Sequence, residues 1–176
     1  GILVLGLFLI TPSQADDIDD FQIEGMSVGD SLLDYFSKKE IEANLSGAQY
    51  PNNEFIIRYF RKLPIFTIYE GVTIAHKASD KDYKIYDIGG SIYYEKNFKN
   101  CHKKMNEIEK ELDQIFENPT VRSGTVKHEY DKTGKSIQTI TEYLFESGHN
   151  AQIVCINWSD ELEKQGHTDE LSISIG

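Results

Sequence analysis

The chain has 176 residues, of which 39% are hydrophobic and 27% are charged. This length and composition indicate one globular domain that buries its own core, and they exclude a disordered chain. The formal net charge of −11 repels phosphate backbones and anionic lipid headgroups. We therefore expect no nucleic-acid partner.

Residues 1–15, GILVLGLFLITPSQA, carry no charge, and residues 2–10 are almost all apolar. The run is too short to span a membrane, which takes about 20 apolar residues, but it has the length of a signal-peptide core. Small residues at Ser13 and Ala15 suit cleavage before Asp16. We predict a signal peptide over 1–15, truncated at its front, with export to the periplasm or the medium and no stable membrane insertion after cleavage. A buried strand or helix of the fold is the alternative.

The export hypothesis divides the rest of the chain into an acidic mature N-terminus, 16–26, and a single domain, 27–176. DDIDD at 16–20 is predicted to be a solvated tail, because it lacks the further oxygen ligands and the glycine turn of a calcium loop. Two short helical segments are expected next, at 27–36 and 37–45. Capping-box-like spacing marks their starts, in the pairs Ser27 with Asp30 and Ser37 with Glu40.

Segments rich in β-branched and aromatic residues are predicted to be strands at 55–60, 65–77 and 83–94. Gly89 and Gly90 lie inside the third, which suggests a bulge or a sharp bend. The clearest helix is predicted over 97–116, because its apolar residues recur at intervals of three and four: Phe98, Cys101, Met105, Ile108, Leu112 and Ile115.

Strand-like segments also follow the long helix, at 121–130, 136–145, 151–158 and 170–176. Short helices, strands, one long helix and more strands do not alternate as in a parallel doubly wound sheet. We therefore predict an α+β fold with one antiparallel sheet, the long helix packed on a face, and short N-terminal helices.

Residues 29–32, Gly-Asp-Ser-Leu, resemble the first block of the GDSL-type esterases. That resemblance implies Ser31 as a nucleophile. The family also has an Asp three residues before its catalytic His, and none of the five histidines here has one. A serine without a base is a poor nucleophile at neutral pH. We therefore interpret Ser31 as a helix-start residue and predict no catalytic residue.

The longer stretch DFQIEGMSVGDSLLDYFSKKEI, residues 20–41, is similar to the mature N-terminus of uncharacterised exported proteins of marine alphaproteobacteria. This resemblance implies export and a small soluble domain, without indicating an activity. We also predict no metal and no cofactor, since no two histidines have the close spacing that zinc sites use.

The two cysteines are expected to pair. Cys101 belongs to the apolar stripe of the long helix, and Cys155 shares one face of its strand with Ala151 and Ile153. If that face packs against the helix, both sulfur atoms lie in one interface. Two cysteines of an exported protein usually form a disulfide. A catalytic Cys101 is the alternative, although His102 is badly placed as its base because adjacent helix residues do not face each other.

One alternating set in 83–94 forms our candidate binding surface, namely Tyr83, Asp87, Ser91 and Tyr93. Exposed tyrosines on a sheet face bind sugars, peptides or proteins, and cross-strand packing is the alternative interpretation. We expect a non-catalytic protein of the cell envelope that binds a partner protein or a small ligand through its sheet. The alternative is an exported hydrolase whose site is assembled from residues distant in the sequence.

Overall fold

The protein folds into one seven-stranded antiparallel sheet with the strand order β1-β2-β3-β7-β6-β5-β4. The computed structural model describes residues 21–47, 52–95 and 97–176, so the expected signal peptide lies outside the described residues. The strands are β1 (Phe55–Arg61), β2 (Gly71–Lys77), β3 (Asp87–Tyr93), β4 (Thr120–Lys127), β5 (Ile137–Leu144), β6 (Asn150–Asn157) and β7 (Glu170–Ile175).

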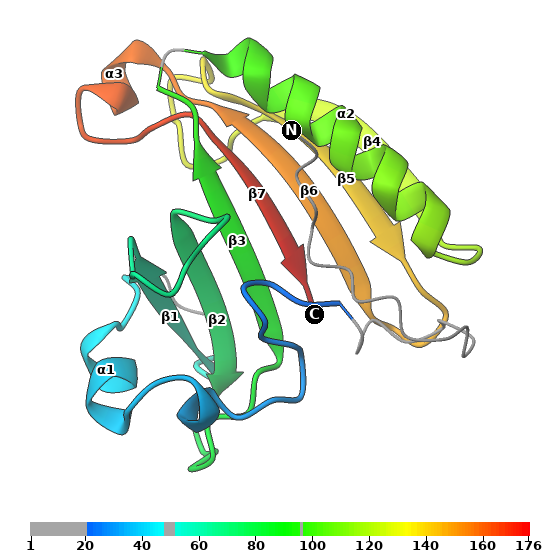
Figure 1. Ribbon diagram of the computed structural model, residues 1–176. Coiled ribbons are helices and arrows are strands. Elements are labelled where there is room, and N and C mark those ends of the chain that lie inside the picture. Colours follow the sequence, from blue (N-terminus) through cyan, green and yellow to red (C-terminus); the bar gives the residue numbers. More distant parts are fainter. Residues whose placement is uncertain (1–20, 48–51, 96) are drawn as a thin grey trace.

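The helices are short except for one. They are the 3-10 helix η2 (Leu32–Asp34), α1 (Lys38–Ala43), the long α2 (Phe98–Ile115) and α3 (Asp160–Glu163). From β3 the chain runs through α2 to β4 at the far edge, and β5, β6 and β7 then return strand by strand until β7 lies beside β3 (Figure 1). The predicted α+β fold is confirmed.

α2 packs on one face of this sheet, which we call the covered face. Its buried side chains are Cys101, Met105, Ile108 and Leu112. They meet the inward residues of β6 and β7, which are fully or almost fully buried: Ala151, Ile153, Cys155, Leu171, Ile173 and Ile175. The spacing of apolar residues determines which side chains are buried: every third or fourth residue along α2, and every second residue along β6 and β7.

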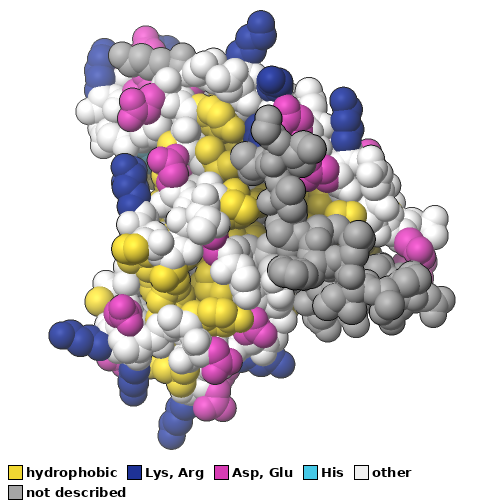
Figure 2. All heavy atoms as spheres, in the orientation of Figure 1, with side chains coloured by type: hydrophobic (Ala, Val, Ile, Leu, Met, Phe, Trp, Pro, Cys, Tyr) yellow, Lys and Arg dark blue, Asp and Glu magenta, His cyan; other side chains and the backbone are white. Residues whose placement is uncertain are grey.

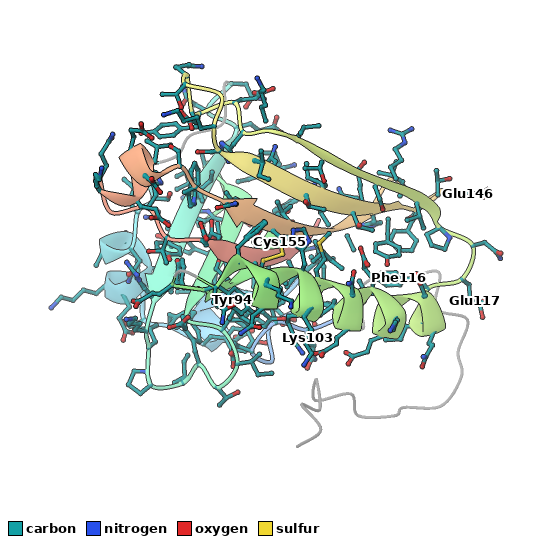
Figure 3. All side chains as sticks on the ribbon, turned by 90° about the horizontal axis from the view of Figure 1, so that it is seen from above. Tyr94, Lys103, Phe116, Glu117, Glu146 and Cys155 are labelled. Carbon is teal, nitrogen blue, oxygen red and sulfur yellow. A yellow bond between two sulfur atoms is a disulfide. The ribbon has the colours of Figure 1, made fainter. Side chains whose placement is uncertain are left out.

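The disulfide is confirmed and ties α2 to this face. Cys101 and Cys155 are joined by an S–S bond of 2.06 Å, with their Cα atoms 5.9 Å apart. Figure 3 shows the bond between the helix and β6, with Phe116 at the other end of α2. None of the helices in the described part of the chain is long and apolar enough to span a membrane.

The N-terminal segment covers the other half of the same face. Phe36 stacks on Phe60 of β1, with ring centroids 4.3 Å apart, and Leu32 and Ile41 are fully buried. Ile23 and Met26, from the predicted acidic N-terminus, are also fully buried in the core. In Figure 2, which shows the side that carries α2, charged side chains lie mostly around the periphery and hydrophobic ones between them.

The local N-terminal predictions hold only in part. Ser37 and Glu40 form the predicted capping box of α1. The helix predicted at 27–36 is wrong, since these residues contain only the single 3-10 turn η2. Gly29 has a positive φ of 97°, which a helix does not allow, and its backbone pairs with Ile85. The backbone N–H of Gly29 donates to the carbonyl of Ile85 (2.8 Å), so a pairing distant in sequence replaces the helix.

The predicted strand 65–77 begins only at Gly71. The preceding loop folds back because the carboxylate of Glu24 accepts hydrogen bonds from the backbone N–H groups of Thr67, Ile68 and Tyr69, at 2.7–2.8 Å.

Gly89 and Gly90 make no bulge, since the pairing with β2 and β7 is continuous through both. Gly90 instead leaves room on the covered face for the ring of Tyr69, 2.5 Å from where a Cβ would stand.

Candidate functional site

The opposite side of the sheet, which we call the open face, has no described helix packed on it (Figures 1 and 3). Its residues follow from the strand register: each lies one position along the strand from a residue of the covered face. The central row reads Arg61, Gly71, Ser91, Ser172 and Val154 across β1, β2, β3, β7 and β6. The middle of the face is therefore lined with small side chains.

A group of aromatic, charged and hydroxyl-bearing side chains from β1, β3 and β7 lies on the open face. We call it the tyrosine cluster and define it as Tyr59, Arg61, Ser91, Tyr93 and Glu170. The hydroxyls of the two tyrosines are hydrogen-bonded to each other. The guanidinium carbon of Arg61 lies 5.0 Å from the centre of the Tyr93 ring, a cation–π arrangement. The cluster therefore combines aromatic faces, hydroxyls and both signs of charge.

The glycine at position 71 makes room for the tyrosine cluster, because it has no side chain. Tyr59 crosses diagonally over Gly71, where a Cβ would stand 2.7 Å from the tyrosine oxygen. Any larger residue at this position would push Tyr59 away from Tyr93. The backbone N–H of Tyr93 is itself held by the carboxylate of Glu70, at 2.9 Å.

Two ionisable groups of the cluster, Glu170 and Tyr93, are partly desolvated. Burial raises the pKa of Glu170, while the Ser91 hydroxyl and the charge of Arg61 act in the opposite direction. Burial also raises the pKa of Tyr93, and its hydrogen bond to Tyr59 acts in the same direction. Tyr93 therefore stays neutral at physiological pH.

The predicted surface residues do not all meet. Ser91 and Tyr93 belong to the tyrosine cluster. Asp87 shares their face but stands at the other end of β3, roughly 20 Å from Tyr93 at about 3.3 Å per residue. Burial raises the pKa of Asp87 to about 6. Tyr83 lies before the strand, with a φ of 51°, and its ring packs 5.0 Å from His76 on the covered side.

A second aromatic group lies just past the ends of β4 and β6, and we call it the tryptophan group. The ring of Trp158 contacts those of His128 and His167, at centroid distances of 4.4 and 4.6 Å. Tyr130, which is 60% exposed, contacts Trp158 and His167. Ile156 of the open face pairs with Glu170 of the tyrosine cluster and stands two positions before Trp158 in the chain.

Ser31 occupies the position of a helix-start residue. Its hydroxyl accepts from the backbone N–H of Leu33 (3.2 Å) and donates to the carbonyl of Asp82 (2.6 Å). Among the described residues, no group of three or more His, Cys, Asp or Glu side chains is arranged to hold a metal ion.

Comparisons of the chain with models of known protein families, with curated proteins and with solved structures found no match. The assignment of function therefore depends on the physical features of the surface.

Sequence reasoning missed Tyr59, Arg61, Glu170 and Trp158. Alternation indicates which neighbours share a face within one strand, but the cluster is formed by β1, β3 and β7. The one available signal was Gly71, a glycine at the start of a strand, which often marks close approach of another group.

Proposed function

We propose that the protein is an exported, non-catalytic binding protein that holds a partner protein on the open face of its sheet. The observation that carries this proposal is the combination of an uncovered sheet face with the tyrosine cluster and the tryptophan group. Tyrosine, tryptophan and arginine are the side chains most enriched at the centres of protein interfaces.

The arrangement favours a partner protein over a small ligand. Small ligands are held in concave sites that bury most of their surface, whereas stable protein interfaces bury about 800 Å² on each partner. Ile156 pairs with Glu170 of the tyrosine cluster and precedes Trp158 by two positions, so the two groups share one side of the sheet. A hollow lies elsewhere, between the start of α2 and α3, lined by Phe98, Asn157, Asp160, Glu163, Lys164 and Asp169.

Two features favour binding over hydrolysis. The open-face carboxyls with raised pKa, Asp87 and Glu170, lie roughly 20 Å apart at opposite ends of the strands, much farther than the ~5–9.5 Å of glycosidase pairs. His76 accepts a hydrogen bond from Arg58 (3.1 Å) and is only 1% exposed, so it is not available as a base for a substrate.

Export is supported by the Cys101–Cys155 disulfide, because disulfides persist in oxidising compartments. The test is mass spectrometry of the protein recovered from the periplasm. We expect a chain that begins at Asp16. A product that retains residues 2–10 would contradict export.

The binding function is tested by capture of envelope proteins on immobilised wild-type protein, with quantitative mass spectrometry. Arg61→Glu and Tyr93→Ala should each remove the captured partner, because they reverse the charge of the tyrosine cluster or remove its aromatic ring. Tyr35→Ala is the matched control, an exposed tyrosine of the N-terminal segment. Equal capture by wild type and both open-face variants would overturn the proposal.

A further inference from the structure

The two edges of the sheet differ in their backbone hydrogen bonds. At the β1 edge, the carbonyl of Ile57 accepts from Ser46 and the N–H of Tyr59 donates to Asn44, both at 2.9 Å. A bridge between Leu45 and Arg58 lies between these bonds. The chain therefore closes this edge with its own segment 44–46.

The β4 edge is open. All eight residues of Thr120–Lys127 are exposed, including Val121 at 48% and Val126 at 50%. Exposed edge strands are usually protected by charged side chains, proline, a bulge or short length. β4 has neither proline nor a bulge, since its ladder with β5 is continuous over all eight residues. Its protection is limited to two cations, Arg122 and Lys127, which repel a basic strand and not an acidic one.

The register identifies which backbone groups are unpaired. Just past β4, the N–H of His128 donates to the carbonyl of Ser136, just before β5. This bonded pair continues the β4–β5 ladder, so the even-numbered residues of β4 bond inward to β5. The N–H and C=O groups of the odd-numbered residues therefore point outward, and no other described residue hydrogen-bonds them. These residues are Val121, Ser123, Thr125 and Lys127.

The charge of this edge is opposite to that of the whole chain. β4 contains Arg122 and Lys127 and no acidic residue, whereas the chain has a net charge of −11. Glu142 stands opposite Arg122 in β5, but neither cation forms an ion pair with a described residue. The edge thus offers positive charge next to unpaired backbone groups.

We propose that β4 takes up an extended acidic segment of a partner as an additional antiparallel strand. The four outward residues supply the main-chain hydrogen bonds, and carboxylates of the segment lie opposite Arg122 and Lys127. Apolar side chains of the segment lie opposite Val121 and Val126. A second copy of this chain fits less well, because self-pairing brings four cations into one short interface.

This site is separate from the tyrosine cluster of the open face. The nearest cluster residue, Glu170 of β7, is three strands from β4, roughly 14 Å at about 4.8 Å per strand. The tryptophan group, in contrast, begins at His128, directly after β4. Edge variants that lose peptide binding and still capture the open-face partner therefore distinguish the two proposals.

The test uses the fluorescein-labelled peptide Glu-Val-Thr-Ser-Thr-Glu-Val and fluorescence anisotropy with the full chain. In antiparallel pairing its glutamates lie opposite Lys127 and Arg122, and its valines opposite Val126 and Val121. We expect saturable binding of this peptide. The peptide with lysine in place of both glutamates should bind at least about fivefold more weakly. Equal binding of both peptides would overturn the proposed acidic specificity.

Thr125→Pro removes one outward N–H without touching the ladder to β5, and should weaken peptide binding about tenfold. Thr125→Val is its control, because it also loses the hydroxyl bond to Thr139 (3.0 Å) but keeps the N–H. If both variants bind equally well, pairing at β4 is wrong. Arg122→Glu with Lys127→Glu should abolish the preference for the acidic peptide.

The control for that charge change is Lys81→Glu with Lys110→Glu, two exposed lysines outside the edge, which should preserve the preference. Analytical ultracentrifugation of the wild type tests whether two copies of the chain pair through the β4 edge. A dimer that Thr125→Pro dissociates would assign the edge to a second copy and overturn the acidic-segment proposal.

Discussion

The two faces of the sheet differ although their residues alternate along the same strands. On the covered face one row reads Phe60, Val72, Gly90, Ile173 and Ile153 across β1, β2, β3, β7 and β6. The next position along each strand gives the open-face row, Arg61, Gly71, Ser91, Ser172 and Val154. A single step along the chain thus separates the core from the surface that we propose for binding.

The comparison teaches that stability and recognition are assigned to opposite sides. Aliphatic side chains, the disulfide and Tyr69 fill the covered face, so substitutions there should act on the free energy of unfolding. The open face carries desolvated polar groups, so substitutions there should change pH dependence or binding. The following predictions test this division.

The largest effect is expected for the disulfide between α2 and β6. Cys155→Ala opens a link between residues 54 apart in sequence, and the chain-entropy model gives about 4 kcal/mol for such a loop. Urea unfolding of the oxidised wild type and the variant measures this loss. Below its lowered melting temperature, the variant should keep the circular dichroism of the wild type. Two free thiols in the native wild type would contradict the prediction.

Gly90→Ala should be the next most destabilising change. Its Cβ would stand 2.5 Å from ring atoms of Tyr69, and overpacking of this kind costs roughly 1–3 kcal/mol. Gly124→Ala in β4 is the control, since nothing lies within 4 Å of its Cβ position. Urea unfolding that gives the same stability for both variants would show that the covered face tolerates a shift of Tyr69.

Asp87→Asn should stabilise the protein, and only at higher pH. The folded-state pKa of Asp87 is raised from 3.8 to about 6, because burial disfavours the charged carboxylate. The penalty is absent below the unfolded-state pKa and complete above the folded-state one. We therefore expect a gain of about 1–2 kcal/mol at about pH 8 and almost none at about pH 3.

The control for this prediction is Asp34→Asn, an exposed carboxyl of the N-terminal segment, which should change stability little at either pH. Urea unfolding at both pH values decides the outcome. A gain from Asp87→Asn that is equal at both would contradict desolvation as its cause.

Ser31→Ala should give the smallest effect, about 1 kcal/mol, because it removes a cap of η2 and the hydrogen bond to Asp82. The loss reports how firmly the N-terminal segment holds to the covered face. Binding should be unchanged, as Ser31 does not belong to the open face. Fluorophosphonate labelling of wild-type Ser31 would contradict its structural role.

Residue periodicity was sufficient for most of the elements. The three- and four-residue spacing from Phe98 to Ile115 predicted α2, and every strand of the sheet lies within or close to a segment rich in β-branched or aromatic residues. The disulfide could be predicted because both cysteines lie on inward positions of regular elements. These signals depend on neighbours a few residues away, which the sequence contains directly.

Only part of the tyrosine cluster could be predicted from the sequence. Ser91 and Tyr93 were found because alternation puts them on one face of β3. Tyr59 and Glu170 reach them only through the strand order β1-β2-β3-β7, which places segments more than 75 residues apart side by side. Tyr83 does not lie on the open face, because it precedes β3 and its positive φ interrupts the strand alternation.

The sequence by itself determined the α+β class, the long helix, the strands and the pairing of Cys101 with Cys155. Only the tertiary structure decided which face α2 and the N-terminal segment cover, and that the β1 edge is closed while the β4 edge is open. It also decided the role of Gly90. This glycine leaves space for the ring of Tyr69 and does not form a bulge. The physical reason is that local spacing fixes where a side chain points on its own element, whereas the partner element depends on the register and order of distant strands.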